Sequence, residues 1–419
     1  MALGRRVLKM SQKGKTIVII GTLDTKSEEA LYLKERIERR GHHPLVMDVG
    51  TGGKVSFQPD FAREEVALAT GRTLKEILAT TEKYTDGLTA MAMGAKSIIQ
   101  KLIAEKKIDG LLSIGGALGT TETLMIMREL PLNIPKLSLS TVAFVADLIT
   151  SEVVSIDQAM IQSVADLWGL NRVTRMALQR AAGAICGMVE EQEEKEGEKK
   201  PLVAISALGV HTYVDRCKSL LLAKGYEPVV FHSVGTGALE KLIRQGYFRG
   251  TLDLSCYELV NYVCGGPVKG GEEKFTAACE EGIPQVIAPG ALDFFPWPLQ
   301  DPLPAKFKNR TKSLHARVNL IETTPKEQEK TAILLAEKIN KASAPVVLLI
   351  PLKGFSKLDR SKEMPFYDPE AGRRFVNILK ENVSNPLVEI EEMEVHINDP
   401  AFAERATALL LDKMLTKNI

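Results

Sequence analysis

The sequence has few aromatic residues, almost no net charge and no apolar run of membrane-spanning length. Aromatic residues make up 5% of the 419 residues, which argues against the stacking platforms that bind single-stranded nucleic acid. Lys and Arg number 54 against 53 Asp and Glu, a formal charge of +1, so the chain has no net attraction to phosphate backbones or anionic lipid. We therefore expect no nucleic acid and no membrane as a partner.

Targeting signals and paired cysteines are also missing. Apolar runs such as Thr16–Ile20 and Val346–Ile350 have the length of strands, whereas a membrane span needs roughly 18 residues. The basic arm at residues 1–15 lacks the apolar core of a signal peptide, so we expect a cytoplasmic protein. The five cysteines form no CxxC pair and are odd in number, which favours buried reduced thiols over disulfides or zinc.

What remains is an ordinary globular composition, with 45% hydrophobic and 26% charged residues. The length predicts two domains. Between them we place residues 190–200, EEQEEKEGEKK, which contain no apolar residue and follow a helix-like run over Arg172–Val189. This stretch is either a charged linker or a frayed helix end. The predicted domains are residues 16–189 and 201–419.

The two predicted domains begin alike. Each opens with a strand, a helix that ends in a basic residue and glycine, a proline, a second strand and then Gly-Thr-Gly. Gly41 and Gly225 are as far apart along the chain as Pro44 and Pro228, a spacing that favours duplication over the alternative of chance similarity between βαβ units. The first half then inserts residues 54–93 before a helix that we expect to resume at Gly94.

Strands of Val, Ile and Leu alternate with helices in both halves. Such strands are buried on both faces, so each half should be a Rossmann-like, doubly wound parallel α/β sheet, with a cleft between the domains. Ligands of open α/β sheets bind outside the carboxyl ends of the strands, so the loops there are the candidate sites. Besides the first strand of each half, the expected strands are Leu45–Val49, Leu111–Ile114, Lys136–Ser140, Thr251–Leu254, Gln285–Ala288 and Val346–Ile350.

The first candidate loop lies between the strand Thr16–Ile20 and a predicted helix, Glu28–Arg40. Thr25 and Glu28 have the spacing of a capping box, so a structural cap is one interpretation. Glycine, free amides at a helix start and an adjacent lysine also suit a phosphate. The candidate residues are Gly21, Thr22, Asp24, Thr25 and Lys26.

Two further glycine-rich loops follow predicted strands. The first is Gly50–Gly53, whose candidates are Gly52 and Gly53, with a counterpart in the second half at Gly235, Thr236 and Gly237. Either anion-binding nests or tight turns explain these glycines. The other loop, residues 115–122, combines glycines with hydroxyl groups, as a phosphate cradle does, although ligand-free turns also have this composition. Its candidates are Gly115, Gly116, Gly119, Thr120 and Thr121.

Standard motifs add little. GxGxxG, a complete P-loop and GxSxG are absent. His211 and His315 are expected to face the cleft, as substrate-binding or acid/base groups or as structural histidines. Polar segments at Pro289–Asp293 and Pro351–Ser356 follow strands and either close the second domain's side of the cleft or form surface loops.

An ordered series of motifs resembles one family, the largely uncharacterised proteins similar to the N-terminal, ATP-binding inhibitory domain of the tomato mosaic virus resistance protein. The series runs GTLDTK (residues 21–26), GTGG (50–53), GGALGT (115–120), GLNR (169–172), GTG (235–237), PGALD (289–293), PLKGFSKLD (351–359), PFYDPEA (365–371) and INDPAFA (397–403). The resemblance implies two Rossmann-like subdomains, ATP with Mg²⁺ mainly on the first, and a homodimer. It also implies that a TIM-barrel protein, fused in plants and fungi, is a separate partner in bacteria.

The chain departs from the family pattern at Ala117 and Leu118, at Phe144 and Val145, and at Ala316. The change at Ala117 and Leu118 narrows the phosphate loop. The changes at Phe144, Val145 and Ala316 concern the substrate half of the site. We expect a protein that binds ATP and Mg²⁺ and a small-molecule ligand, with phosphoryl transfer, adenylyl transfer or hydrolysis as its reaction. Lys26 and Thr120 are then candidates for phosphate contact and Asp24 for Mg²⁺. The alternative is a nucleotide-gated interaction module without turnover.

Overall fold

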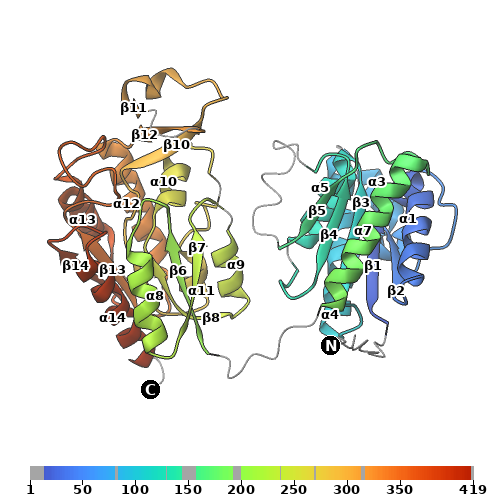
Figure 1. Cartoon of the computed structure of the whole chain (residues 1–419), viewed down its shortest axis with the longest axis horizontal. Helices are drawn as coiled ribbons and strands as arrows, with labels where there is room; N and C mark the ends of the chain where they lie inside the picture. The colour runs from blue at the N-terminus through green and yellow to red at the C-terminus, as the bar shows by residue number, and fades with distance from the viewer. Residues whose placement is uncertain are drawn as a thin grey trace, which may run out of the picture. The chain divides into compact units, whose positions relative to one another are not determined.

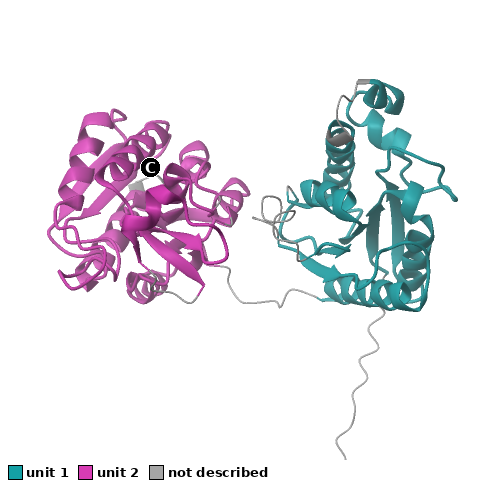
Figure 2. Cartoon of the chain, turned by 90° about the horizontal axis from the view of Figure 1, so that it is seen from above, with its two compact units in different colours: residues 1–195 teal, residues 196–419 magenta. Residues whose placement is uncertain are grey.

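The chain folds into two compact units, residues 1–195 and 196–419 (Figure 2). The computed structural model describes residues 14–80, 84–128, 130–143, 157–191, 200–235, 237–268, 270–312 and 317–416. Among the residues singled out by sequence, Phe144, Val145, Thr236, His315 and Ala316 lie outside these ranges. Each unit is described by itself.

The N-terminal unit is a five-stranded sheet in the order β2-β1-β3-β4-β5, with every neighbouring pair parallel (Figure 1). Its strands are β1 (Thr16–Gly21), β2 (His43–Asp48), β3 (Gly110–Gly115), β4 (Lys136–Ser140) and β5 (Ala159–Gln162). Its helices are α1 (Leu23–Glu38), α2 (Arg63–Leu68), α3 (Leu74–Thr80), α4 (Tyr84–Ala104), α5 (Ala117–Met127) and α7 (Arg172–Glu190).

Helices cover both faces of this sheet because successive strand residues point to opposite sides. Ile17 and Ile19 of β1 pack in one core with α1 and α7. Val18 and Ile20 pack in a second core with α2, α4 and α5. The chain reverses its direction of winding between β1 and β3, which makes their carboxyl ends the switch point of the sheet.

The C-terminal unit has a six-stranded parallel sheet in the order β14-β13-β9-β8-β6-β7. The strands are β6 (Leu202–Ala207), β7 (Glu227–His232), β8 (Phe248–Asp253), β9 (Gln285–Ile287), β13 (Val346–Pro351) and β14 (Val388–Met393). The helices are α8 (Tyr213–Ala223), α9 (Ala238–Arg244), α10 (Tyr257–Cys264), α11 (Thr276–Glu280), α12 (Pro325–Ile339), α13 (Ala371–Asn382) and α14 (Pro400–Thr416). Helices α8 and α14 cover one face, and the other helices pack in separate cores on the other.

The predicted doubly wound α/β class is therefore confirmed for both units. The order β2-β1-β3-β4 in the first unit recurs as β7-β6-β8-β9 in the second. In both, the proline that the sequence repeat aligns stands in the second strand and pairs with the second residue of the first strand, Pro44 with Ile17 and Pro228 with Val203. The shared register supports the internal repeat.

One sheet was not predicted from the sequence. Strands β10 (Phe294–Pro298), β11 (Thr311–Lys312) and β12 (Val318–Glu322) form a small antiparallel sheet in the C-terminal unit, with the 3₁₀ helix η1 (Ala305–Arg310) between β10 and β11. Two prolines in β10 remove backbone donors, so its sequence does not read as a regular strand.

Three predicted helix starts are wrong. Helix α1 begins at Leu23 and α5 at Ala117, so only one residue, Thr22 or Gly116, separates each helix from the preceding strand. Helix α4 begins at Tyr84 and contains Gly94 in its interior. A β-carbon at Gly94 would lie 2.0 Å from the Val66 carbonyl oxygen. This glycine therefore serves the close approach of α2 to α4 and does not start a helix.

All five cysteines are buried and free, as predicted. Among the residues described here, no helix combines the length and apolarity that a membrane span requires. Residues 192–199 of the predicted linker and residues 1–13 of the arm lie outside the described ranges. Glu190, assigned to the linker from sequence, is the last residue of α7 and hydrogen-bonds His42 at 2.8 Å.

Candidate functional site

The carboxyl ends of β1, β2 and β3 bring the three predicted loops of the N-terminal unit together. Asp24, in the first turn of α1, lies against the glycine loop that follows β2. A β-carbon at Gly52 would stand 3.1 Å from Asp24 Oδ2, and one at Gly53 would stand 2.9 Å from Asp24 Cβ. Gly53 also has a φ of 56°, a left-handed conformation that favours glycine. These glycines therefore leave the space in which Asp24 sits.

Asp48, the last residue of β2, holds this edge together and was missed by sequence analysis. Its Oδ1 accepts hydrogen bonds from the amides of Leu23, at 3.0 Å, and Gly50, at 2.9 Å. Arg63 lies 3.9 Å from Oδ2 and donates to the Gly53 carbonyl oxygen at 2.9 Å. Burial raises the pKa of Asp48, while the two amides and the Arg63 charge oppose that rise.

Glu122, on α5, completes an acidic cluster with Asp24 and Asp48. Its side chain is buried, and burial together with the charges of Asp48 and Asp24 raises its pKa well above the usual value. One buried oxygen of each residue, Asp24 Oδ1, Asp48 Oδ2 and Glu122 Oε1, has no hydrogen-bond partner in the described structure. Buried oxygens without donors are costly, so this cluster has unused capacity to bind a donor or a cation.

Two helices begin at this edge without a side-chain cap from their own N-cap residue, although Asp48 accepts from the first amide of α1. Thr22 stands at the N-cap of α1 but makes no side-chain bond to the helix amides. The predicted Thr25–Glu28 capping box does not form, because the Thr25 hydroxyl instead donates to the Thr22 carbonyl oxygen at 3.2 Å. Gly116 is the N-cap of α5 and has no side chain to offer. Both helix starts therefore direct positive dipole ends to this edge.

Lys26 is the basic residue beside this edge. It is only 7% exposed and has non-helical angles of φ −125° and ψ 20° within α1. Its ammonium lies 5.8 Å from the ring centre of Trp168, which is 80% exposed. No described residue accepts a hydrogen bond from this ammonium, so it is available to an anionic ligand.

The glycines of the third loop serve different purposes. A β-carbon at Gly115 would lie 2.7 Å from the Gly119 carbonyl carbon, so Gly115 permits close packing of β3 on α5. Gly21 is similar, because its β-carbon would meet Ile114 at 2.9 Å. A β-carbon at Gly116 would have Thr141 Oγ1 as its nearest neighbour, at 3.8 Å. The adjacent Ala117 and Leu118 are exposed. Gly116 is thus the member of this loop that faces open space.

The two hydroxyls predicted to face a phosphate already have internal partners. Thr120 is buried, and its Oγ1 lies 2.7 Å from Ser140 Oγ. The Thr121 hydroxyl donates to the Ala117 carbonyl oxygen at 3.1 Å, one turn earlier in the helix. These contacts hold α5 against β4 and within its own first turn.

The equivalent edge of the C-terminal unit contains its own cation. Lys274 Nζ lies 2.8 Å from Asp253 Oδ1 and 3.2 Å from Glu258 Oε2, and Glu258 Oε1 accepts from the Gly235 amide at 3.3 Å. Burial would lower the pKa of Lys274, but the charges of Asp253, Glu258 and Glu240 raise it overall. Here the Gly235 amide bonds a carboxylate that is already paired with Lys274, and Gly237, at φ 59°, caps α9.

His211 is a buried residue of the C-terminal unit with both ring nitrogens engaged. Nδ1 accepts from the Leu208 amide at 3.1 Å, and Nε2 lies 3.2 Å from the Phe355 carbonyl oxygen. Burial lowers the pKa of His211 to about 3, so the ring is neutral at physiological pH. These are the contacts of a structural histidine.

The fold and the site together define a class, a two-unit, doubly wound α/β protein with an acidic, glycine-lined sheet edge in its N-terminal unit. Residues 15–194 match the N-terminal domain, and residues 200–414 the C-terminal domain, of the Uncharacterised protein family (UPF0261). The chain belongs to this family.

Relatives agree with this assignment over nearly the whole chain. A UPF0261 protein of Clostridium tetani is 37% identical over 404 residues, which cover 96% of this chain and 99% of that protein. The ToMV resistance protein Tm-1(GCR237) of Solanum lycopersicum is 32% identical over 413 residues, which confirms the predicted resemblance. The match covers 92% of this chain but 54% of the tomato protein, so the chain spans about half of that protein's length.

Among solved structures, the glycosyltransferase SnogD from Streptomyces nogalater aligns with 95% of this chain and 100% of its own, at 9% identity and a TM-score of 0.24. A likeness at that level carries no argument about function.

Proposed function

We propose that the N-terminal unit binds ATP with Mg²⁺ at the carboxyl ends of β1, β2 and β3. The observation that carries this proposal is the start of α5, which has no side-chain cap and faces open space, beside the start of α1 and buried carboxylate oxygens without partners among the described residues. Helix N-termini with free amides favour phosphate oxygens. Lys26, with no other acceptor among the described residues, adds a point charge for the same group.

The acidic cluster makes Mg²⁺ a requirement of this proposal. Asp24, Asp48 and Glu122 would repel a bare triphosphate at the same edge. Within the described ranges no three acidic, histidine or cysteine side chains are arranged to hold a metal ion by themselves. That fits Mg²⁺, which is usually held by one or two carboxylates together with water and substrate phosphates. Asp24, through its unpartnered Oδ1, is the proposed protein ligand, and the metal would neutralise phosphate charge.

The reaction that we propose is ATP-dependent phosphoryl or adenylyl transfer, or hydrolysis, with a small molecule as acceptor. Positioning and charge neutralisation are the main demands of such reactions, and this edge offers both. The family resemblance implies the same nucleotide, and it adds a homodimer and a TIM-barrel protein as proposed partners. Labelled ATP recovered intact after incubation with acceptors and that partner would favour an interaction module without turnover.

A substitution at Gly116 tests the nucleotide site. A β-carbon there meets no atom closer than 3.8 Å, so Gly116→Val should fold normally while its side chain fills the open space before α5. Equilibrium dialysis with labelled ATP and Mg²⁺ should show affinity reduced by at least about ten-fold, or 1.4 kcal/mol. Gly187→Val, at an open and exposed position of α7, is the matched control and should bind like the parent protein. Equal affinity of the two variants would contradict this site.

A further inference from the structure

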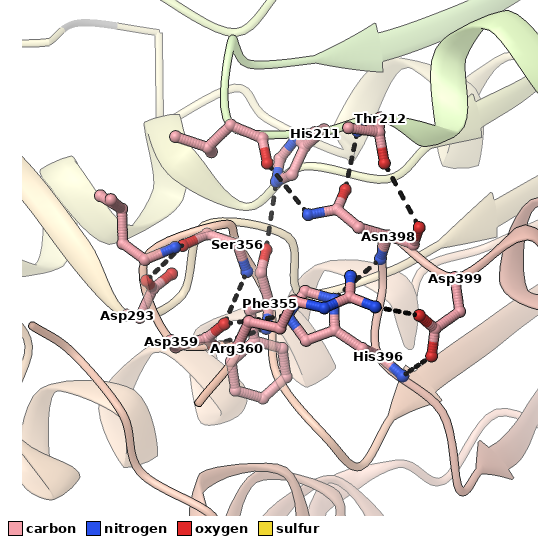
Figure 3. A network of polar contacts seen from close by, with 12 residues as sticks. His211, Thr212, Asp293, Phe355, Ser356, Asp359, Arg360, His396, Asn398 and Asp399 are labelled. Carbon is pink, nitrogen blue, oxygen red and sulfur yellow. Dashed lines mark hydrogen bonds and ion pairs between the residues drawn. The ribbon is translucent and has the colours of Figure 1, made fainter. Parts of the chain in front are cut away.

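Four motif segments that the nucleotide site does not use converge in the C-terminal unit. Pro289–Asp293 follows β9, Pro351–Asp359 follows β13, Pro365–Ala371 precedes α13, and Ile397–Ala403 leads from β14 into α14. Strands β9, β13 and β14 are neighbours, so their carboxyl ends share one edge. Figure 3 shows side chains of three of these segments in one polar network.

Asp359 is the acceptor at the centre of this network (Figure 3). Its Oδ2 accepts from the Phe355 amide at 2.6 Å, and its Oδ1 accepts from the Ser356 amide at 3.1 Å. His396 Nε2 lies 3.1 Å from the same Oδ1. Gly354, at φ 125°, leaves room for it, because a β-carbon there would stand 2.6 Å from Asp359 Oδ1. Donors on several sides suit the charged form of this carboxylate.

Asp293 is satisfied on one oxygen only. Ser356 Oγ accepts from the Leu358 amide at 2.9 Å and therefore donates its own proton to Asp293 Oδ2 at 2.6 Å. Asp293 is 4% exposed, and its Oδ1 is buried without a hydrogen bond to any described residue. Burial, together with the charge of Asp359, raises the pKa of Asp293 well above the usual value.

Asp293 lines a small pocket that has an acidic and aromatic lining. The other lining residues that matter here are Glu322, Asp359, Asp368, Phe355 and Phe366, and among the described residues no lysine or arginine lines the pocket. The antiparallel sheet builds one wall, since Phe294 of β10 pairs with Glu322 of β12. Arg374 pairs with Asp368 outside the lining. Lys312 and Arg310 lie outside the lining and partly offset the charge of Glu322, whereas the charged groups that act on Asp293 are acidic.

We propose that this pocket binds the ammonium group of a small primary amine, with Asp293 Oδ1 and Glu322 as its acceptors. An ammonium offers three donors, which supplies a partner to the unpaired oxygen and a charge to the pocket. Phenylalanine rings next to carboxylates favour an organic cation.

Amine binding at this pocket does not depend on the proposed nucleotide site, because that site lies in the N-terminal unit. Binding of the cation favours ionised Asp293, so a proton should leave the pocket when the amine binds near neutral pH. The charged groups that face Asp293 are Asp359 and Glu322, and those that face Glu322 are Lys312, Asp368 and Arg310. Asp359 in turn contacts His396.

Calorimetric titration of the full chain with ethylammonium chloride tests the proposal. We expect saturable binding with a Kd on the order of 1 mM, the best that three non-hydrogen atoms usually achieve. The heat should depend on the ionisation enthalpy of the buffer, as proton release requires. Asp293→Asn and Glu322→Gln should each weaken binding by at least about ten-fold, while Asp301→Asn, at an exposed position, should not change it.

Circular dichroism of each variant separates lost binding from lost folding, and Glu322→Gln, at a half-buried position, keeps the test open if Asp293→Asn does not fold. No saturable heat with ethylammonium would overturn the proposal. Equal binding by folded Glu322→Gln and Asp301→Asn would also overturn it. Saturable binding of Mg²⁺ with none of ethylammonium would replace the amine with a metal site.

Discussion

Lys26 stands out at the residue scale because its side chain is only 7% exposed and has no acidic partner among the described residues. In α1 its backbone leaves helical geometry, and its side chain contacts only the face of Trp168 among described rings and acceptors. The ammonium itself stays open to solvent. The proposed phosphate would give this charge an anionic partner.

Replacing Lys26 with Ala should raise the Kd for Mg·ATP about ten-fold or more, the usual effect of losing one charge-assisted contact. Lys101→Ala, at an exposed position of α4, should leave the Kd unchanged. Fluorescence titration with a labelled ATP analogue measures both values. If Lys26→Ala binds as tightly as Lys101→Ala, the phosphate role of Lys26 is wrong.

Glu122 gives a prediction about pH. Its pKa is raised above the unfolded value of 4.5 by burial and by Asp48 and Asp24, so its contribution to stability is full below 4.5 and is lost as pH rises through the raised pKa. Glu122→Gln should remove this dependence and raise the free energy of unfolding near pH 8 by on the order of 1 kcal/mol. Urea unfolding of both proteins between pH 5 and pH 8 measures the difference, and a variant less stable at pH 8 would contradict the assignment.

At the scale of elements, the sequence predicts regular segments well and their junctions poorly. β4 has the predicted bounds, and α7 extends the predicted helix by one residue, because apolar periodicity marks both. The starts of α1 and α5 were predicted too late, because a single residue, Thr22 or Gly116, separates each helix from its strand. Small residues at such a turn are typical of loops, so the sequence predicts a longer loop than the structure has.

The candidate site of the N-terminal unit was also predicted only in part from the sequence. Glycines after strands located three loops that the fold brings to one edge. Asp48 and Glu122 gave no signal, because a single acidic residue at a strand end or in a helix is ordinary until the fold places it beside Asp24. Two of the four C-terminal segments, Pro289–Asp293 and Pro351–Ser356, were predicted as polar loops, and all four carry motifs of the family resemblance. Their shared pocket depends on an antiparallel sheet that the prolines of β10 conceal.

The packing of α2 on α4 can be tested at Gly94. A β-carbon there would overlap the Val66 carbonyl oxygen, at 2.0 Å, so the two helices would have to separate. Gly94→Ala should lower the free energy of unfolding by about 1–3 kcal/mol, as overpacking usually does. Gly187→Ala, where no atom lies within 4 Å, should be neutral or stabilising by up to about 1 kcal/mol. Urea denaturation compares them, and a neutral Gly94→Ala would contradict the packing.

At the scale of the whole molecule, the two units share one topology, but the charged side chains at the equivalent sheet edge are paired differently. In the C-terminal unit the buried Lys274 forms close ion pairs with Asp253 and Glu258. Among the described residues at the N-terminal edge, Arg63 lies 3.9 Å from Asp48, and the Lys26 ammonium has no acceptor. A cation that is paired within the protein offers less to an anionic ligand, so this contrast supports the proposal of a nucleotide in the N-terminal unit.

Each unit also has its own hydrophobic cores. The N-terminal unit expressed alone, as residues 14–191, should therefore fold cooperatively and bind Mg·ATP within about three-fold of the full chain, a difference below 1 kcal/mol. Residues 200–416 alone should bind none. Calorimetry of the two fragments checks this, and binding by the second fragment would reverse the assignment.

The central claim is tested most directly by calorimetric titration of the full chain with ATP, once with Mg²⁺ and once with EDTA. We expect saturable binding of one ATP per chain with Mg²⁺ and affinity at least about a hundred-fold lower without it, because the acidic edge at Asp24 then faces the phosphates with no metal ion between them. Equal affinity in both titrations would contradict the role of the acidic edge. Absence of binding in both would contradict the nucleotide site itself.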